Sequence, residues 1–295
     1  MLGPPTSHRR SREPRLQSFA TNLPPLLASP AEVTANRQEL IGTGAELVAA
    51  LPTAQREPIG RALIAGLDHL YADASLSTTD RLDTAYADIA LAKAADGKGD
   101  GKVSPAVLAK VRARVDWADT SAKDLMTRQA VISDAADLLS KAGDRAGAAT
   151  LLKAELKRSA QPYYYMLDLA SLAEDAGDGK AAIDWAHQAY ETAHGSATRV
   201  QWAIAWSNTV LRQAPGDKAA VEASAMAVID ELAKNPDSYY QRTRVKVTAW
   251  GQKLQAWSAD HDGAKLLDRL QGKMAGVCAK QGSEAATCGK WSRVA

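Results

Sequence analysis

The stretch that decides the fold is residues 136–189, ADLLSKAGDRAGAATLLKAELKRSAQPYYYMLDLASLAEDAGDGKAAIDWAHQA. The tripeptide Ala-Gly-Asp occurs in it twice, at Ala142–Asp144 and at Ala176–Asp178, 34 residues apart. Each copy lies between a helical pattern and a second Ala-rich one, and glycine marks the break between them. The stretch therefore predicts two helical hairpins that share the same turn.

An interval of 34 residues is also the period of the tetratricopeptide repeat (TPR). Four alanines stand where helices of such a repeat cross closely: Ala136, Ala148, Ala170 and Ala182. The match is partial. Ala189 fits the next small position, but Glu155 stands there in the earlier unit, and the closing proline is absent from both.

A third turn of the same kind follows at Ala214–Asp217, with a drifted spacing. We therefore predict an all-α fold of antiparallel helical hairpins stacked as a degenerate TPR-like superhelix. Ordinary hairpins that happen to share a turn sequence are the alternative.

The whole chain is predicted to fall into four regions. These are a disordered basic, Pro-rich tail over 1–28, an N-terminal helical region over 29–118, the TPR-like region over 119–280 and a C-terminal tail over 281–295. Ser29, followed by Pro30 and Glu32, is typical of a helix start. Two sets of apolar residues recur every three or four positions and predict buried helix faces: Ile59, Leu63, Leu67 and Leu70, and Val247, Trp250, Leu254 and Trp257.

The charge balance favours no polyanionic partner. The chain has 36 basic and 34 acidic residues, for a net charge of +2. The basic excess lies in the first 20 residues, so the remainder is close to neutral and nucleic-acid binding is not predicted. No apolar run reaches the roughly 18–20 residues of a membrane span. There is also no secretory signal, so the protein is cytoplasmic or this chain begins inside a longer reading frame.

No catalytic, cofactor-binding or metal-binding residue is predicted. The glycine-rich stretch Asp96–Lys102 fails the spacing tests for a phosphate loop and for a calcium loop, and a solvated turn is favoured. The five histidines are scattered, although His187 and His194 would share a face if one helix spanned both. No HExxH or GxSxG motif is present.

Two Tyr-rich segments are candidates for contact with a partner. Tyr163, Tyr164 and Tyr165 are consecutive, so they cannot all face the interior of a helix. Tyr239 and Tyr240 precede a segment in which Arg242, Arg244 and Lys246 lead to Trp250. For that segment an amphipathic helix with its basic side in water is favoured over a nucleic-acid surface.

Cys278 and Cys288 are the only cysteines, and their spacing is not the CxxC of a redox-active helix start. A structural disulfide that holds the tail to the last helix is favoured, and it suits an oxidising compartment. Two reduced cysteines in a cytoplasmic protein remain the alternative.

Several separated phrases resemble one family. They are Ser121–Asp144, Leu152–Asp168, Ala197–Trp206 and Val277–Lys280 with Cys288. Together, over roughly residues 25–290, they are similar to the C-terminal helical region of bacterial thioredoxin-family proteins that are exported to the periplasm. Those proteins join an N-terminal thioredoxin domain to a TPR-like α domain. The thioredoxin domain and its CxxC are missing here, so no active-site residue carries over.

The resemblance implies a periplasmic setting and a link to thiol–disulfide chemistry, and it suggests that Met1–Ala20 is a start-site artefact. The favoured function is a non-catalytic scaffold or accessory region that presents a surface to a protein or peptide partner. A free-standing cytoplasmic TPR-like adaptor is the second hypothesis. A thiol–disulfide oxidoreductase that uses Cys278 and Cys288 is the third.

Overall fold

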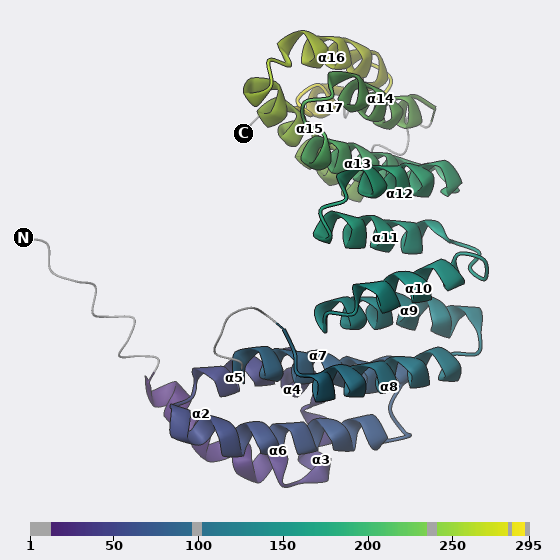
Figure 1. Ribbon diagram of the computed structural model, residues 1–295. Coiled ribbons are helices and arrows are strands. Elements are labelled where there is room, and N and C mark those ends of the chain that lie inside the picture. The colour runs from purple at the N-terminus through teal and green to yellow at the C-terminus, as the bar shows by residue number, and fades with distance from the viewer. Residues whose placement is uncertain (1–12, 96–101, 235–240, 283–284, 293–295) are drawn as a thin grey trace, which may run out of the picture. The chain divides into compact units, whose positions relative to one another are not determined.

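The computed structural model describes residues 13–95, 102–234, 241–282 and 285–292 (Figure 1). These ranges contain sixteen α-helices and no β-strand, so the prediction of an all-α fold is confirmed. The chain divides into two compact units, Met1–Leu151 and Leu152–Ala295. This division lies inside a helix and differs from the boundary predicted near residue 118.

The first unit is built from eight helices and the start of a ninth. They are α2 (Glu13–Leu27), α3 (Pro30–Ala35), α4 (Arg37–Gly42), α5 (Gly44–Ala50), α6 (Thr53–Ala72), α7 (Thr78–Ala95), α8 (Pro105–Ser121), α9 (Leu125–Lys141) and α10 (Arg145–Glu155), which crosses the division. The long helix α6 lies at the centre of a cluster formed with α2, α3, α4, α5 and α7. Its predicted face of Ile59, Leu63, Leu67 and Leu70 is buried, as expected.

Helix α2 corrects the prediction of a disordered tail over 1–28. Leu23 and Leu27 are buried in the first unit's core, and α2 packs against α6. Pro24 and Pro25 lie within the helix but face solvent, so their missing N–H donors are not buried. Burial of the leucines stabilises a helix that composition alone does not favour. Residues 1–12 lie outside the described part of the chain.

Helix starts follow the expected chemistry at two positions. The Ser29 side chain accepts a hydrogen bond from the Glu32 backbone N–H, and Pro30 is the first residue of α3. Ser104 caps α8 in the same way, through the backbone N–H of Val107. Of the glycine-rich stretch Asp96–Lys102, residues 96–101 lie outside the described part of the chain.

The second unit contains seven further helices. They are α11 (Tyr163–Asp175), α12 (Gly179–Thr192), α13 (Ser196–Gln213), α14 (Lys218–Lys234), α15 (Gln241–Asp260), α16 (Ala264–Cys278) and α17 (Ala285–Cys288). Helices α11, α12, α13 and α14 pack in succession, each on the one before it (Figure 1). Helix α15 packs on α13, and α16 packs on α14. The predicted apolar face of α15 is buried in this unit's core, as expected: Val247, Trp250, Leu254 and Trp257.

The two Ala-Gly-Asp turns are built alike. Gly143 and Gly177 have φ values of +95° and +76°, a conformation that glycine adopts without strain. The following aspartate then caps the next helix. Asp144 accepts from the Gly147 backbone N–H at 2.9 Å, and Asp178 accepts from that of Ala181 at 3.0 Å. One turn thus ends a helix and begins the next within three residues.

The small residues that the repeat pattern singled out are all buried: Ala136, Ala148, Ala170, Ala182 and Ala189. Glu155, which departs from the pattern, is also buried, at 1% exposure. A long, ionisable side chain is therefore buried where the repeat pattern expects a small one. Descent from a TPR ancestor stays a prediction.

Candidate functional site

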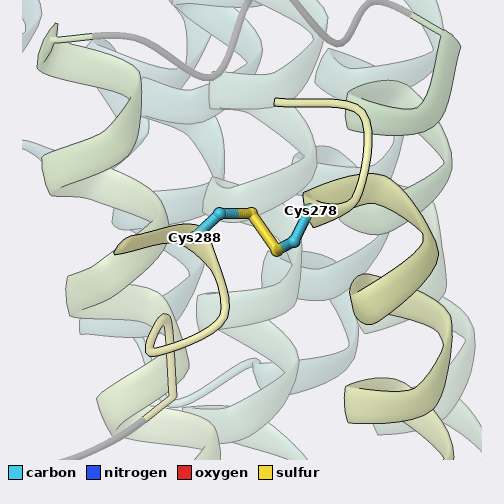
Figure 2. The surroundings of a disulfide bond; sticks show 2 residues. All are labelled: Cys278 and Cys288. Atoms are coloured by element: carbon cyan, nitrogen blue, oxygen red, sulfur yellow. A yellow bond between two sulfur atoms is a disulfide. The ribbon is translucent and has the colours of Figure 1, made fainter. Parts of the chain in front are cut away.

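The cysteine pair is bonded in the structure. The Cys278 and Cys288 Sγ atoms lie 2.00 Å apart, and the bond joins the end of α16 to the end of α17 (Figure 2). The two residues are 4% and 0% exposed. Thiol–disulfide exchange needs an attacking thiolate to reach a sulfur atom, and this burial hinders that approach.

The disulfide lies beside a tryptophan pair that fixes the C-terminal segment. Trp291 stacks on Trp250 of α15 with a centroid distance of 5.1 Å. Gln271 of α16 donates a hydrogen bond to the Ser292 hydroxyl at 2.9 Å. The segment after α16 therefore packs into the core of the second unit, and the geometry suits a structural role for the bond.

The three consecutive tyrosines lie in the first turn of α11, and they differ in burial. Tyr163 and Tyr165 are buried, whereas Tyr164 is 42% exposed. Tyr164 is therefore the residue of the three that can contact a partner. Tyr239 and Tyr240 lie outside the described residues. In the helix that follows them, Trp250 is buried while Arg242 and Lys246 are exposed, so the described part is an amphipathic helix.

Tyr164 belongs to an aromatic cluster formed between α11 and α13. Its ring lies edge-on to Trp202 with centroids 5.2 Å apart, and Tyr163 lies 5.6 Å from the same indole. Trp202 is half-buried, and its buried indole Nε1 has no hydrogen-bond acceptor among the described residues. Such a donor costs stability.

One turn further along α13, Trp206 forms the floor of an open groove between α12 and α14. We call this the aromatic groove; its volume is about 570 Å³, and His187, Tyr190, Glu191, Trp206, Met226 and Asp230 are among the residues that line it. His187 packs on Trp206 at 4.2 Å between centroids, and Tyr190 stacks on Trp206 at 5.7 Å. This volume lies in the range of small-ligand and side-chain pockets.

A buried ion network supports the groove from below. Glu231 is 1% exposed; it accepts a hydrogen bond from the Tyr190 hydroxyl at 2.9 Å and pairs with Arg199 and Lys234, each at 3.0 Å. Burial by itself would raise the pKa of Glu231, but the hydrogen bonds from Lys234, Tyr190 and Arg199 outweigh it and lower that pKa. Glu231 is thus held ionised, and it fixes the Tyr190 ring.

His187 lies in the groove, but the predicted His187/His194 face does not exist. Helix α12 ends at Thr192, and His194 lies in the turn that follows. The broken helix separates the two side chains. Within the described ranges, no group of three or more His, Cys, Asp or Glu side chains is arranged to hold a metal ion.

The first unit has a polar cluster of its own. Arg114 is 2% exposed and pairs with Asp68 at 2.6 Å and Asp88 at 2.7 Å, while its guanidinium lies over the Tyr71 ring. Burial raises the pKa of Asp88, and the nearby charges of Arg114 and Lys110 oppose that rise. Because its charges are matched, this cluster serves as a structural support between α6, α7 and α8.

Sequence reasoning missed Trp202, Trp206 and Asp230. A signal was present, because two tryptophans four residues apart share a helix face, but their neighbours come from other helices.

In the described residues no helix is both long and apolar enough to cross a bilayer. No protein-family model, curated protein or solved structure matches the chain.

Proposed function

We propose that the chain is a non-catalytic helical scaffold that presents the aromatic face of its second unit to a protein or peptide partner. One observation carries the proposal: exposed Tyr164 and half-buried Trp202 and Trp206 follow one another across α11 and α13. Large aromatic side chains left in contact with solvent are typical of interfaces, where they are enriched and supply most of the binding energy.

The scaffold is proposed to be of the thioredoxin-family type and to act in periplasmic thiol–disulfide handling. The phrases that resemble that family support the assignment. The bonded, buried cysteine pair supports an oxidising compartment. The second candidate, a cytoplasmic adaptor, uses the same surface but would keep Cys278 and Cys288 reduced. Mass spectrometry of alkylated native protein separates the two, since free thiols exclude the periplasmic assignment.

The third candidate, an oxidoreductase, has weaker support because both cysteines are buried. Insulin reduction by the full chain is the direct assay. We expect insulin to be reduced no faster with the full chain than in buffer alone. Activity that is lost in Cys278→Ser would replace the scaffold proposal by the enzymatic one.

Partner binding is tested with a photo-crosslinking amino acid at position 164. A matched control carries the same amino acid at position 126, where Met126 is 83% exposed on the first unit. We expect a discrete adduct from position 164 alone. The adduct partner, once purified, should bind the full chain in a calorimetric titration, and Tyr164→Ala should weaken that binding at least fivefold. Equal adducts from both positions, or no loss in Tyr164→Ala, would reject this surface.

A further inference from the structure

We propose that the aromatic groove binds an arginine side chain of the partner. The inference rests on the proposed function and names the chemical group that the groove takes. It follows from three features of the groove: an aromatic floor, a carboxylate on each wall and an apolar strip beside them.

The floor of the groove is aromatic, and half-buried Trp206 is partly open to it. Tyr190 and Trp206 stack at an interplanar angle of 13°, and His187 packs on the same indole. The chain already uses one of these rings in this way, because the Arg199 guanidinium lies 4.6 Å from the Tyr190 centroid. Guanidinium groups stack well on indole and phenol rings.

Of the charged residues that line the groove, Glu191 and Asp230 are acidic and Lys234 is basic. Glu191 on α12 forms an ion pair with His187 when that histidine is protonated, with Oε1 and Nε2 3.6 Å apart. No ion-pair partner of Asp230 on α14 occurs among the described residues. Lys234 also lines the groove, but it is paired with Glu231 at 3.0 Å. Two carboxylates therefore line opposite walls of the groove, and among the described residues their one ion-pair partner is His187, which is charged only when protonated.

Arginine fits this arrangement better than lysine. Its guanidinium carries five N–H donors in a planar fork, so one group can stack on Trp206 while it donates to Glu191 and Asp230. Met226 and Ala227 of α14 form an apolar strip along the groove for the aliphatic stem. An ammonium group lacks the plane that stacks on an aromatic ring.

The test uses the full ¹⁵N-labelled chain and its indole N–H resonances, with the signal of Trp206 assigned from Trp206→Phe. Probes are N-acetyl-arginine amide, N-acetyl-lysine amide and N-acetyl-citrulline amide, the last being a neutral isostere of arginine. We expect arginine to shift the Trp206 resonance saturably with a Kd on the order of millimolar. Lysine should bind at least threefold more weakly, and citrulline should produce no saturable shift. An equal response to citrulline or lysine, or no shift with arginine, overturns the inference.

A charge-matched pair of variants locates the site. Glu191→Gln with Asp230→Asn should weaken arginine binding at least tenfold. Asp260→Asn with Asp268→Asn removes the same charge from exposed positions on α15 and α16 and should change the Kd less than twofold. Equal losses in both pairs would reduce the effect to net charge and overturn the site. Crosslinking from position 164 does not depend on this outcome, so the proposed function can stand where the arginine inference fails.

Discussion

The Trp291 carbonyl lies against the backbone of Gly251, so that a Cβ atom added at Gly251 would come within 2.3 Å of the carbonyl oxygen. The glycine lies inside α15, where its lack of a side chain lowers helix stability. The same absence lets the C-terminal segment approach α15 closely enough for Trp291 to stack on Trp250.

Gly251→Ala should therefore destabilise the second unit although alanine is the better helix former. A methyl group must displace the Trp291 backbone, and overpacking of this kind costs about 1–3 kcal/mol. Gly272→Ala is the matched control, because nothing lies within 4 Å of a Cβ at that position of α16. Its free energy of unfolding should rise by up to about 1 kcal/mol. Urea unfolding measures both, and equal effects would show that the contact with Trp291 has no energetic weight.

Removal of the disulfide should loosen the same segment. Cys278→Ser with Cys288→Ser is expected to lower the free energy of unfolding by roughly 2–3 kcal/mol, from the regained entropy of a short loop in the unfolded chain. Trp291 should then become more accessible to acrylamide quenching. The wild-type chain reduced under denaturing conditions and refolded is the control. A double variant as stable as the oxidised wild type would show that the bond adds no stability.

The sequence predicted elements whose signal is local. The buried faces of α6 and α15 follow from apolar spacing, and the cap at Ser29 follows from a side chain next to its own helix. Helix α2 was not predicted, because the energy that stabilises it comes from packing Leu23 and Leu27 against α6.

The candidate site was predicted only in part, for a related reason. The exposure of one residue among Tyr163–Tyr165 follows from helical geometry, and Tyr164 is that residue. The aromatic groove requires α12, α13 and α14 to be packed together, with His187, Trp206 and Asp230 each on a different helix. No residue spacing in the sequence predicts that these three helices pack together, so the groove is seen only in the folded structure.

Asp178 gives a direct measure of the Ala-Gly-Asp turn. Asp178→Ala removes the oxygen that accepts from the Ala181 backbone N–H at the start of α12, and should cost about 1 kcal/mol of unfolding free energy. Asp178→Asn keeps an acceptor and should remain within a few tenths of a kcal/mol of the wild type. Chemical unfolding distinguishes them. A similar loss in both variants would assign the effect to charge instead of capping.

Asp83 makes the stability of the first unit depend on pH. Burial, followed by the carboxylates of Asp134 and Asp80, raises the pKa of Asp83 from 3.8 to about 6. Because the folded state holds the proton more tightly than the unfolded state, stability falls as pH rises from about 4 to 6.

Asp83→Asn removes this penalty. After allowance for solvent screening, it should stabilise the chain by about 1 kcal/mol at pH 7.5, a rise in Tm of about 2–4 °C. Most of the gain should vanish at pH 4. Asp116→Asn, at an exposed position of α8, is the control for the loss of one negative charge. A pH-independent gain in Asp83→Asn would contradict the raised pKa.

Glu231 links the stability of the second unit to the shape of the aromatic groove. Glu231→Ala leaves the Tyr190 hydroxyl and the partly exposed Arg199 without their shared carboxylate and should cost about 2–3 kcal/mol, in the range for hydrogen bonds to a charged group. Tyr190→Phe removes one hydrogen bond, at about 1 kcal/mol, and keeps the ring that stacks on Trp206. Thermal unfolding should therefore show a larger drop in Tm for Glu231→Ala than for Tyr190→Phe. Arginine-amide binding should survive in Tyr190→Phe, because the aromatic floor and the two acids of the groove, Glu191 and Asp230, remain. If Tyr190→Phe loses binding but little stability, the phenol hydroxyl itself contacts the ligand. The hydroxyl would then bind the ligand directly, and the Glu231 network would not act only as a support for the Tyr190 ring.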